Sequence, residues 1–167
     1  QKYLYIISEV MSKICKKYDN IVFETIGAGK LHIDNIKINQ KGWSYATEVK
    51  NLQNFDIGIM PLSDDNWTRG KGGYKLLQYM ALGIPCCASP VGINNELIID
   101  GFTGYLPDSV EEWIIKLSIL IDNIDIRITM GENGRKVVEN KYSFHANYPI
   151  LEENLMKILS LKGNNNV

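Results

Sequence analysis

Three cations stand among glycines in one short segment of the chain. Residues 68–75 read Thr-Arg-Gly-Lys-Gly-Gly-Tyr-Lys and lead directly into an apolar helical pattern. Glycine lets the backbone approach an anion closely, and the first turn of a helix offers free N–H groups and a partial positive charge. This composition indicates a site for a diphosphate. The candidate anion-binding residues are Arg69, Gly70, Lys71, Gly72, Gly73 and Lys75.

The segment matches neither a Walker nor a GxGxxG pattern. A flexible surface loop with solvated cations would have the same composition, so both interpretations stay open. Gln78 follows Lys75 by about one helical turn and could hydrogen-bond a ribose hydroxyl, although a solvated glutamine is the common alternative.

A second loop with the same character covers residues 89–96 and ends at another predicted helix start. Val91, Gly92 and Asn94 are its candidates for binding a second anion or a sugar hydroxyl, with a simple strand-to-helix connection as the alternative. Gly27 opens a Gly-Ala-Gly turn after the first predicted strand and joins the candidate set.

No other catalytic set is apparent in the sequence. His32 and His145 are far apart, and neither forms a Ser-His-Asp or Cys-His arrangement. Cys86 and Cys87 are adjacent in an apolar run, which fits neither a disulfide framework nor a metal site and favours a reducing, cytoplasmic setting. We therefore expect no bound metal.

Short apolar strands alternate with helical patterns along the chain. This order predicts an α/β fold, a doubly wound, Rossmann-like parallel sheet with helices on both faces. The expected strands are 22–26, 36–38, 57–60, 84–88 and 104–106. Helices are expected over residues 3–17, 74–82 and 124–140. Three others are expected from their caps: one capped by Ser44, one capped by Asn94 or Asn95 that ends at Gly101, and one capped by Ser109 together with Glu112. A last helix is expected from Ser143. Ligands of such sheets bind beyond the carboxyl ends of the strands, where the candidate loops fall.

Length and composition indicate one domain. The chain has 167 residues, is 45% hydrophobic and carries a formal net charge of -1, which gives no general attraction to nucleic acid. No apolar run is long enough to cross a membrane, and no signal peptide is visible. We expect a domain over residues 1–162 and a disordered tail at 163–167, which has little apolar content. Because a helix comes first, we expect an opening strand and an N-terminal domain to precede it.

Four blocks of the sequence follow one another at tight spacing: 56–62, 75–85, 88–92 and 96–106. They resemble the C-terminal domain of retaining glycosyltransferases of family four, which have the GT-B fold. The likeness extends to residues 130–135 and to Tyr142-Ser143, and it is strongest over 55–107.

The resemblance implies that this domain binds a nucleotide-sugar donor, UDP- or GDP-linked, and that an acceptor glycan or lipid-linked glycan binds the N-terminal domain. It implies a hexosyltransferase that acts with retention and without a cofactor in cell-envelope polysaccharide biosynthesis. It also implies a cytoplasmic enzyme, with peripheral association with the inner face of the membrane as a further expectation.

The sequence departs from the family at two glutamates separated by seven residues. Gly70 and Gln78 stand at those positions, so the role of the first glutamate near the transferred sugar is in doubt, whereas Gln78 could still bond the ribose. Two other interpretations stay open: a non-catalytic nucleotide-sugar binding module, and a GT-B epimerase-like enzyme. We expect the isolated fragment to have no transferase activity.

Overall fold

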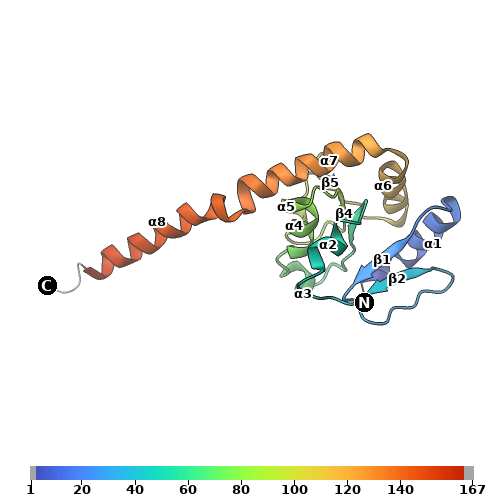
Figure 1. Ribbon diagram of the computed structural model, residues 1–167, viewed down its shortest axis with the longest axis horizontal. Helices are drawn as coiled ribbons and strands as arrows, with labels where there is room; N and C mark the ends of the chain where they lie inside the picture. Colours follow the sequence, from blue (N-terminus) through green and yellow to red (C-terminus); the bar gives the residue numbers. More distant parts are fainter. Residues whose placement is uncertain (1–2, 164–167) are drawn as a thin grey trace.

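The computed structural model describes residues 3–163, which form an α/β body and one long helix that projects from it (Figure 1). The strands are β1 (Phe23–Ile26), β2 (Ile38–Lys41), β3 (Gly58–Met60), β4 (Cys86–Ala88) and β5 (Gly104–Tyr105). The helices are η1 (Leu4–Ile7), α1 (Ser8–Lys17), α2 (Glu48–Leu52), α3 (Asn66–Arg69), α4 (Tyr74–Ala81), α5 (Asn94–Leu97), α6 (Val110–Asp122), α7 (Ile124–Val137), η2 (Val138–Tyr142) and α8 (Phe144–Gly163).

All the named strand pairs are parallel, as the sequence predicts. β1 pairs with β2, with Phe23 opposite Ile38, and β4 lies between β3 and β5, with Cys86 opposite both Gly58 and Gly104. The strands form two hydrogen-bonded groups rather than the single sheet expected. β1 and β2 carry mostly polar or half-exposed side chains, so little apolar burial holds them in a continuous sheet with β3.

Side chains of β4 alternate between two apolar cores, because successive residues of a strand point to opposite faces. Cys86 and Ala88 belong to one core with Leu76 and Met80 of α4. Cys87 belongs to the other core, which includes Trp113 of α6 together with residues of α1. Helices therefore cover both faces, and the doubly wound arrangement is confirmed.

The two cysteines of β4 are completely buried. Burial raises the pKa of both thiols well above the usual value, because an apolar core disfavours the thiolate.

The second strand and the following helix differ from the sequence prediction. β2 begins at Ile38, whereas Ile36 forms an antiparallel bridge with Ile33 and packs into the core. The apolar pattern misplaced the strand because pairing with β1 depends on the backbone. Ser44 does not cap a helix: α2 starts at Glu48 with Thr47 as its N-cap, and Tyr45, which the expected helix would have included, is 88% exposed.

Two short helices were missed or misplaced. No helix was expected between the strand at 57–60 and the helix at 74–82, but α3 lies there, and Asp65 and Thr68 cap it reciprocally through side-chain and backbone hydrogen bonds. α5 ends at Leu97 rather than near Gly101, and its N-cap is Ile93. Asn94 was wrongly expected as a cap candidate, because its side chain turns inward.

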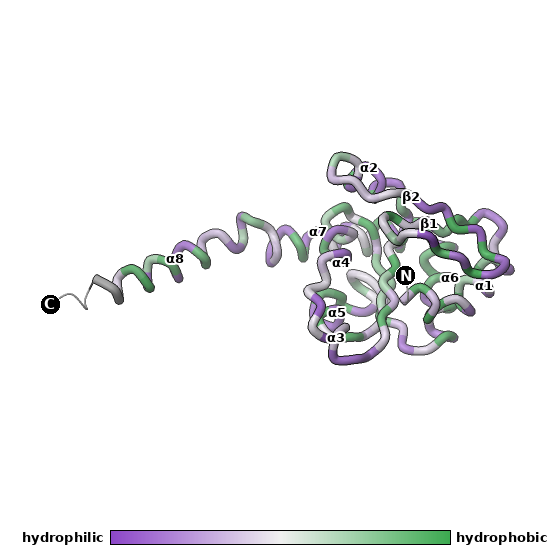
Figure 2. The backbone as a smooth tube through the Cα atoms, turned by 90° about the horizontal axis from the view of Figure 1, so that it is seen from below, coloured by the Kyte–Doolittle hydropathy of each residue, from purple (hydrophilic) through white to green (hydrophobic). Residues whose placement is uncertain are grey.

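The last helices lie close to their expected ranges, although the helix expected over 124–140 ends as an α-helix at Val137. Ser109 caps α6 as expected, and Asn123 caps α7. A π-helical turn then joins α7 to α8, which projects from the body and mixes hydrophilic and hydrophobic residues (Figure 2). Gly163, expected in the disordered tail, belongs to α8, and residues 164–167 lie outside the described part. Within residues 3–163 no helix combines the length and the apolar character that crossing a bilayer requires.

The backbone of α7 lies directly against the backbone at the end of α4. A Cβ added to Gly131 would overlap the carbonyl oxygen of Gly83, which ends α4 in the left-handed conformation. Gly134, one turn later in the same helix, has more room, because an added Cβ would meet Met80 Cγ at 3.4 Å. The crossing therefore requires glycine at 131 but not at 134.

We expect Gly131→Ala to lower the free energy of unfolding by about 1–3 kcal/mol, the usual cost of overpacking. Gly134→Ala is the matched control, since it brings the same gain in helix propensity, about 1 kcal/mol, without the overlap. Urea denaturation of both variants measures the difference, and equal stabilities would contradict this account of the crossing.

Candidate functional site

The loops that follow β3 and β4 meet at the carboxyl edge of the three-stranded sheet. They line a hollow of about 160 Å³ that also contacts η1, α1 and the start of α6. Asp64, Ser89, Pro90 and Val91 contribute to its wall. Ser89 also joins the loops directly, because its Oγ accepts a hydrogen bond from the backbone N–H of Leu62 at 3.0 Å.

Backbone contacts hold the glycine-rich loop against the second loop. Gly92 has φ +55°, and a Cβ there would lie 2.6 Å from the carbonyl oxygen of Arg69. Gly73 has φ +65°, and a Cβ there would collide with Leu97 and approach Ile93 Cγ2 at 2.9 Å. Both glycines are needed for the left-handed backbone and for the close approach. The two loops predicted to bind anions are thus brought together.

The three cations of the glycine-rich loop have different surroundings. Arg69 forms a bidentate ion pair with Asp64, at 2.6 and 2.8 Å, and the paired guanidinium lowers the pKa of the Asp64 carboxyl. The ammonium of Lys71 lies 3.8 Å from the ring centroid of Tyr3. Lys75 is exposed in the first turn of α4, and within residues 3–163 its side chain has no ion pair or hydrogen bond.

The first turn of α4 supplies the backbone donors expected there. Gly73 is the N-cap, and its carbonyl accepts from the backbone N–H groups of Leu76 and Leu77. The preceding N–H groups, those of Gly73, Tyr74 and Lys75, have no backbone acceptor in the described part of the chain. Gly70 ends α3, and Gly72 lies in open space. This end of α4 therefore carries the partial positive charge of a helix N-terminus.

Two candidates of the second loop are buried rather than exposed to a ligand. Val91 is 5% exposed and packs in the core around α4. Asn94 is completely buried, and its amide donates to the carbonyl of Ser89 at 2.9 Å. These two side chains shape the loop. Gly92, by its backbone contact with Arg69, is the member of the set that positions the glycine-rich loop.

Gly27 and Gln78 lie around an aromatic side chain that the sequence interpretation overlooked. A Cβ on Gly27 would be 2.9 Å from Cβ of Trp43. The indole Nε1–H of Trp43 donates to Glu48 at 2.8 Å, and this bond, followed by the amide of Gln78, lowers the pKa of the Glu48 carboxyl. The available signal was position: Trp43 comes two residues after the end of β2, and Gly27 comes one residue after the end of the parallel strand β1, so both lie at the same edge.

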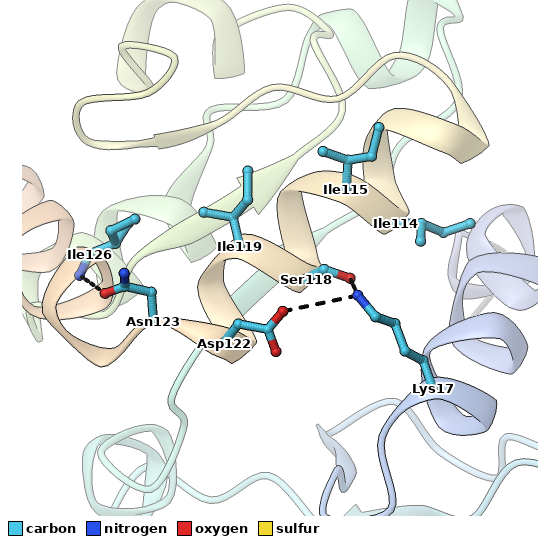
Figure 3. A pocket seen from close by; sticks show the side chains of 8 residues that line it. All are labelled: Lys17, Ile114, Ile115, Ser118, Ile119, Asp122, Asn123 and Ile126. Atoms are coloured by element: carbon cyan, nitrogen blue, oxygen red, sulfur yellow. Dashed lines mark hydrogen bonds and ion pairs between the residues drawn. The ribbon is translucent and has the colours of Figure 1, made fainter.

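A larger hollow of about 500 Å³ lies elsewhere, along α6 and α7 (Figure 3). Isoleucines of these helices make up much of its wall, and Lys17 of α1 reaches in from the other side. Lys17 donates to Ser118 at 2.9 Å and lies 4.0 Å from Asp122. No residue of the glycine-rich loop lines either hollow, and the smaller one carries the carboxylates of Asp64 and Asp108 without a lysine or arginine, so the candidate anion-binding groups at the start of α4 lie outside both hollows.

The histidines do not form a catalytic set. His32 lies 3.1 Å from the carboxylate of Asp34, a neighbour that was not expected, but both side chains are almost fully exposed. Across residues 3–163 no group of three or more His, Cys, Asp or Glu side chains is placed to hold a metal ion.

This sequence and this fold match known proteins. The sequence model of the glycosyl transferases group 1 family matches residues 1–123, and the chain belongs to that family. The chain is 36% identical over 126 residues to an uncharacterized glycosyltransferase of Methanocaldococcus jannaschii, MJ1178, in an alignment that covers 68% of this chain and 34% of the relative.

Solved structures give the fold. TarM of Staphylococcus aureus superposes with a TM-score of 0.71 at 20% identity, over 91% of this chain and 32% of TarM. The C-terminal domain of LpcC, a glycosyl transferase group 1 family protein of Francisella tularensis, superposes with a TM-score of 0.65 at 21% identity, over 86% of this chain and 82% of that domain. The fold is that of the C-terminal domain of a GT-B glycosyltransferase, and the chain spans about a third of the length of MJ1178.

The contact between Gly92 and Arg69 can be tested against a second left-handed glycine. We expect Gly92→Ala to destabilise the protein more than Gly101→Ala, because Gly101 has φ +76° but no atom within 4 Å of an added Cβ. The left-handed backbone costs about 1–2 kcal/mol in either variant, and the clash adds about 1–3 kcal/mol at Gly92 alone. Thermal and urea unfolding give both values, and equal losses would show that the loops do not depend on this contact.

Proposed function

We propose that this domain binds the nucleotide-sugar donor of a glycosyltransferase, and that the whole enzyme transfers the sugar to a glycan or lipid-linked glycan with retention. The observation that carries the proposal is the start of α4, where the exposed Lys75 side chain and the N–H groups of residues 73–75, which have no backbone acceptor in the described part of the chain, lie in one helical turn. TarM, which shares the fold, was solved with UDP. A diphosphate fits such a point because its charge is met by an ammonium and by a helix N-terminus together.

The chemistry proposed for this end of α4 is stabilisation of the leaving group. When the bond between the sugar and the diphosphate breaks, negative charge develops on the phosphate oxygens, and donors already fixed in place lower the barrier. Arg69 contributes less to binding than Lys75 in this proposal, because Asp64 already neutralises it. Lys71 is directed toward Tyr3 and is likewise assigned a smaller role.

The alternatives keep the same binding site and differ in the reaction of the bound donor. A non-catalytic module would bind the nucleotide sugar without turnover, and an epimerase-like enzyme would change the sugar without transfer. Gly70, which stands where the family commonly has a glutamate, is the feature that keeps these alternatives open. Incubating the full-length enzyme with a panel of nucleotide sugars and measuring free nucleoside diphosphate, acceptor products and altered sugars separates the three.

Lys75→Ala tests the phosphate site. We expect the variant to bind UDP or GDP roughly tenfold more weakly, since a hydrogen bond to a charged group contributes about 1.5–3 kcal/mol. Unfolding should change little, because the Lys75 side chain has no ion pair or hydrogen bond in the described part of the chain. Calorimetric titration measures the affinities.

Lys136→Ala is the matched control, because Lys136 is also an exposed helical lysine but lies in the last turn of α7. It should bind nucleotide as wild type does. Equal affinities of wild type and Lys75→Ala would place the diphosphate elsewhere.

A further inference from the structure

Asp64 and Asp65 are neighbours in the chain, but their carboxylates have different partners. Asp65 caps α3: its Oδ1 accepts from the backbone N–H of Thr68 at 2.9 Å, and its Oδ2 accepts from the hydroxyl of Ser63 at 2.6 Å. Asp64 takes no part in this cap, and both of its oxygens accept from the guanidinium of Arg69, at 2.6 and 2.8 Å. The local fold therefore depends on Asp65, whereas Asp64 serves Arg69.

The pair of Asp64 and Arg69 is open to solvent. Each of the two side chains is 58% exposed. Exposed ion pairs are weak, because water and salt compete for both charges. A guanidinium binds a carboxylate and a phosphate group in the same way, through two parallel N–H donors. A phosphate group can therefore replace the Asp64 carboxylate on Arg69.

The backbone of Arg69 is anchored independently of this ion pair. Its N–H donates to the carbonyl of Asp65 at 3.0 Å, and its own carbonyl packs against Gly92. Gly73, the N-cap of α4, packs against Ile93, the next residue of the same loop. The same short segment thus supports both Arg69 and the start of α4, and α3, α4 and α5 lie on the same side of the body (Figure 1, Figure 2).

We propose that Asp64 is an internal competitor of the ligand: its carboxylate occupies Arg69 in the empty domain, and a diphosphate at the start of α4 displaces it and takes over the guanidinium. The inference rests on the proposed function and adds a residue that sets the affinity of that site. A diphosphate carries more negative charge than one carboxylate, which favours the exchange. The reverse exchange weakens the hold on the diphosphate and so aids its release.

A carboxylate can oppose anion binding in two ways, and they can be separated. Competition acts through Arg69 alone, because the anion must break the ion pair to gain the guanidinium. Simple repulsion between Asp64 and the anion acts whether or not Arg69 is present. A double-mutant cycle measures the difference, since it reports how far the effect of one residue depends on the other.

The cycle consists of wild type, Asp64→Asn, Arg69→Ala and the double variant, each as the 167-residue chain. Inorganic pyrophosphate and UDP are titrated into each by calorimetry at one fixed salt concentration. Glu139→Gln is the matched control. Glu139 pairs with Arg135 at 2.8 Å, and both side chains are also 58% exposed, but this pair lies at the end of α7. The control removes the same charge from the chain as Asp64→Asn.

We expect Asp64→Asn to tighten binding of both ligands roughly twofold to fivefold, the contribution of an exposed ion pair that the anion no longer has to break. In the Arg69→Ala background the same substitution should have little effect, because no guanidinium is left to release. Glu139→Gln should bind as wild type does. The unfolding temperature of Asp64→Asn should stay close to that of wild type, since Asp65 keeps the cap of α3.

Unchanged or weaker binding by Asp64→Asn would overturn the proposal, because Arg69 would then not reach the anion or would need Asp64 to position it. An equal gain with and without Arg69 would also overturn it, since repulsion alone would account for the result. If Lys75→Ala weakens binding while Asp64→Asn changes nothing, the proposed function stands and the competitor fails. Absence of binding of either ligand to every variant and to wild type overturns both.

Discussion

The structure depends on complete burial of a three-residue strand. β4 lies between its two parallel neighbours and contributes two thiols and a methyl group, all without solvent exposure. Such small side chains let α4 approach one face and α6 the other. Each helix then carries larger side chains into its core, for example Met80 and Trp113. The loops before α4 and after β4 take their positions from this packing.

The predictable part of the fold is the part governed by apolar pattern. Continuous apolar runs located β3 and β4, and the glycine after α4 marked its end correctly. β2 was misplaced because its residues after Ile38 are polar, so pairing with β1, not side-chain burial, decides where it runs. α3 was missed although Asp65 and Thr68 have capping spacing, since a helix of four residues is too short to show an apolar period.

In the candidate site, too, features set by local sequence could be predicted, whereas those set by distant contacts could not. Glycine at 27, 73 and 92 was expected to let an anion approach the backbone, and the structure shows that each one, with positive φ, lets another part of the chain approach closely. Side-chain roles depend on partners far along the chain, which local composition does not reveal. Arg69 is engaged by Asp64, Asn94 is turned into the core, and Trp43 reaches Glu48. Only the structure separates a cation with a partner from one that is available to a ligand.

The raised pKa of the β4 thiols also has a practical consequence. Alkylating reagents react with thiolates, and these two cysteines are both inaccessible and protonated while the sheet is intact. Cys15, on α1, is partly exposed and is the one thiol of the three that a reagent can meet in the closed molecule. A label on Cys86 or Cys87 then records a separation of α4 or α6 from the sheet. Mass spectrometry of the alkylated chain therefore measures how often the core around β4 becomes exposed.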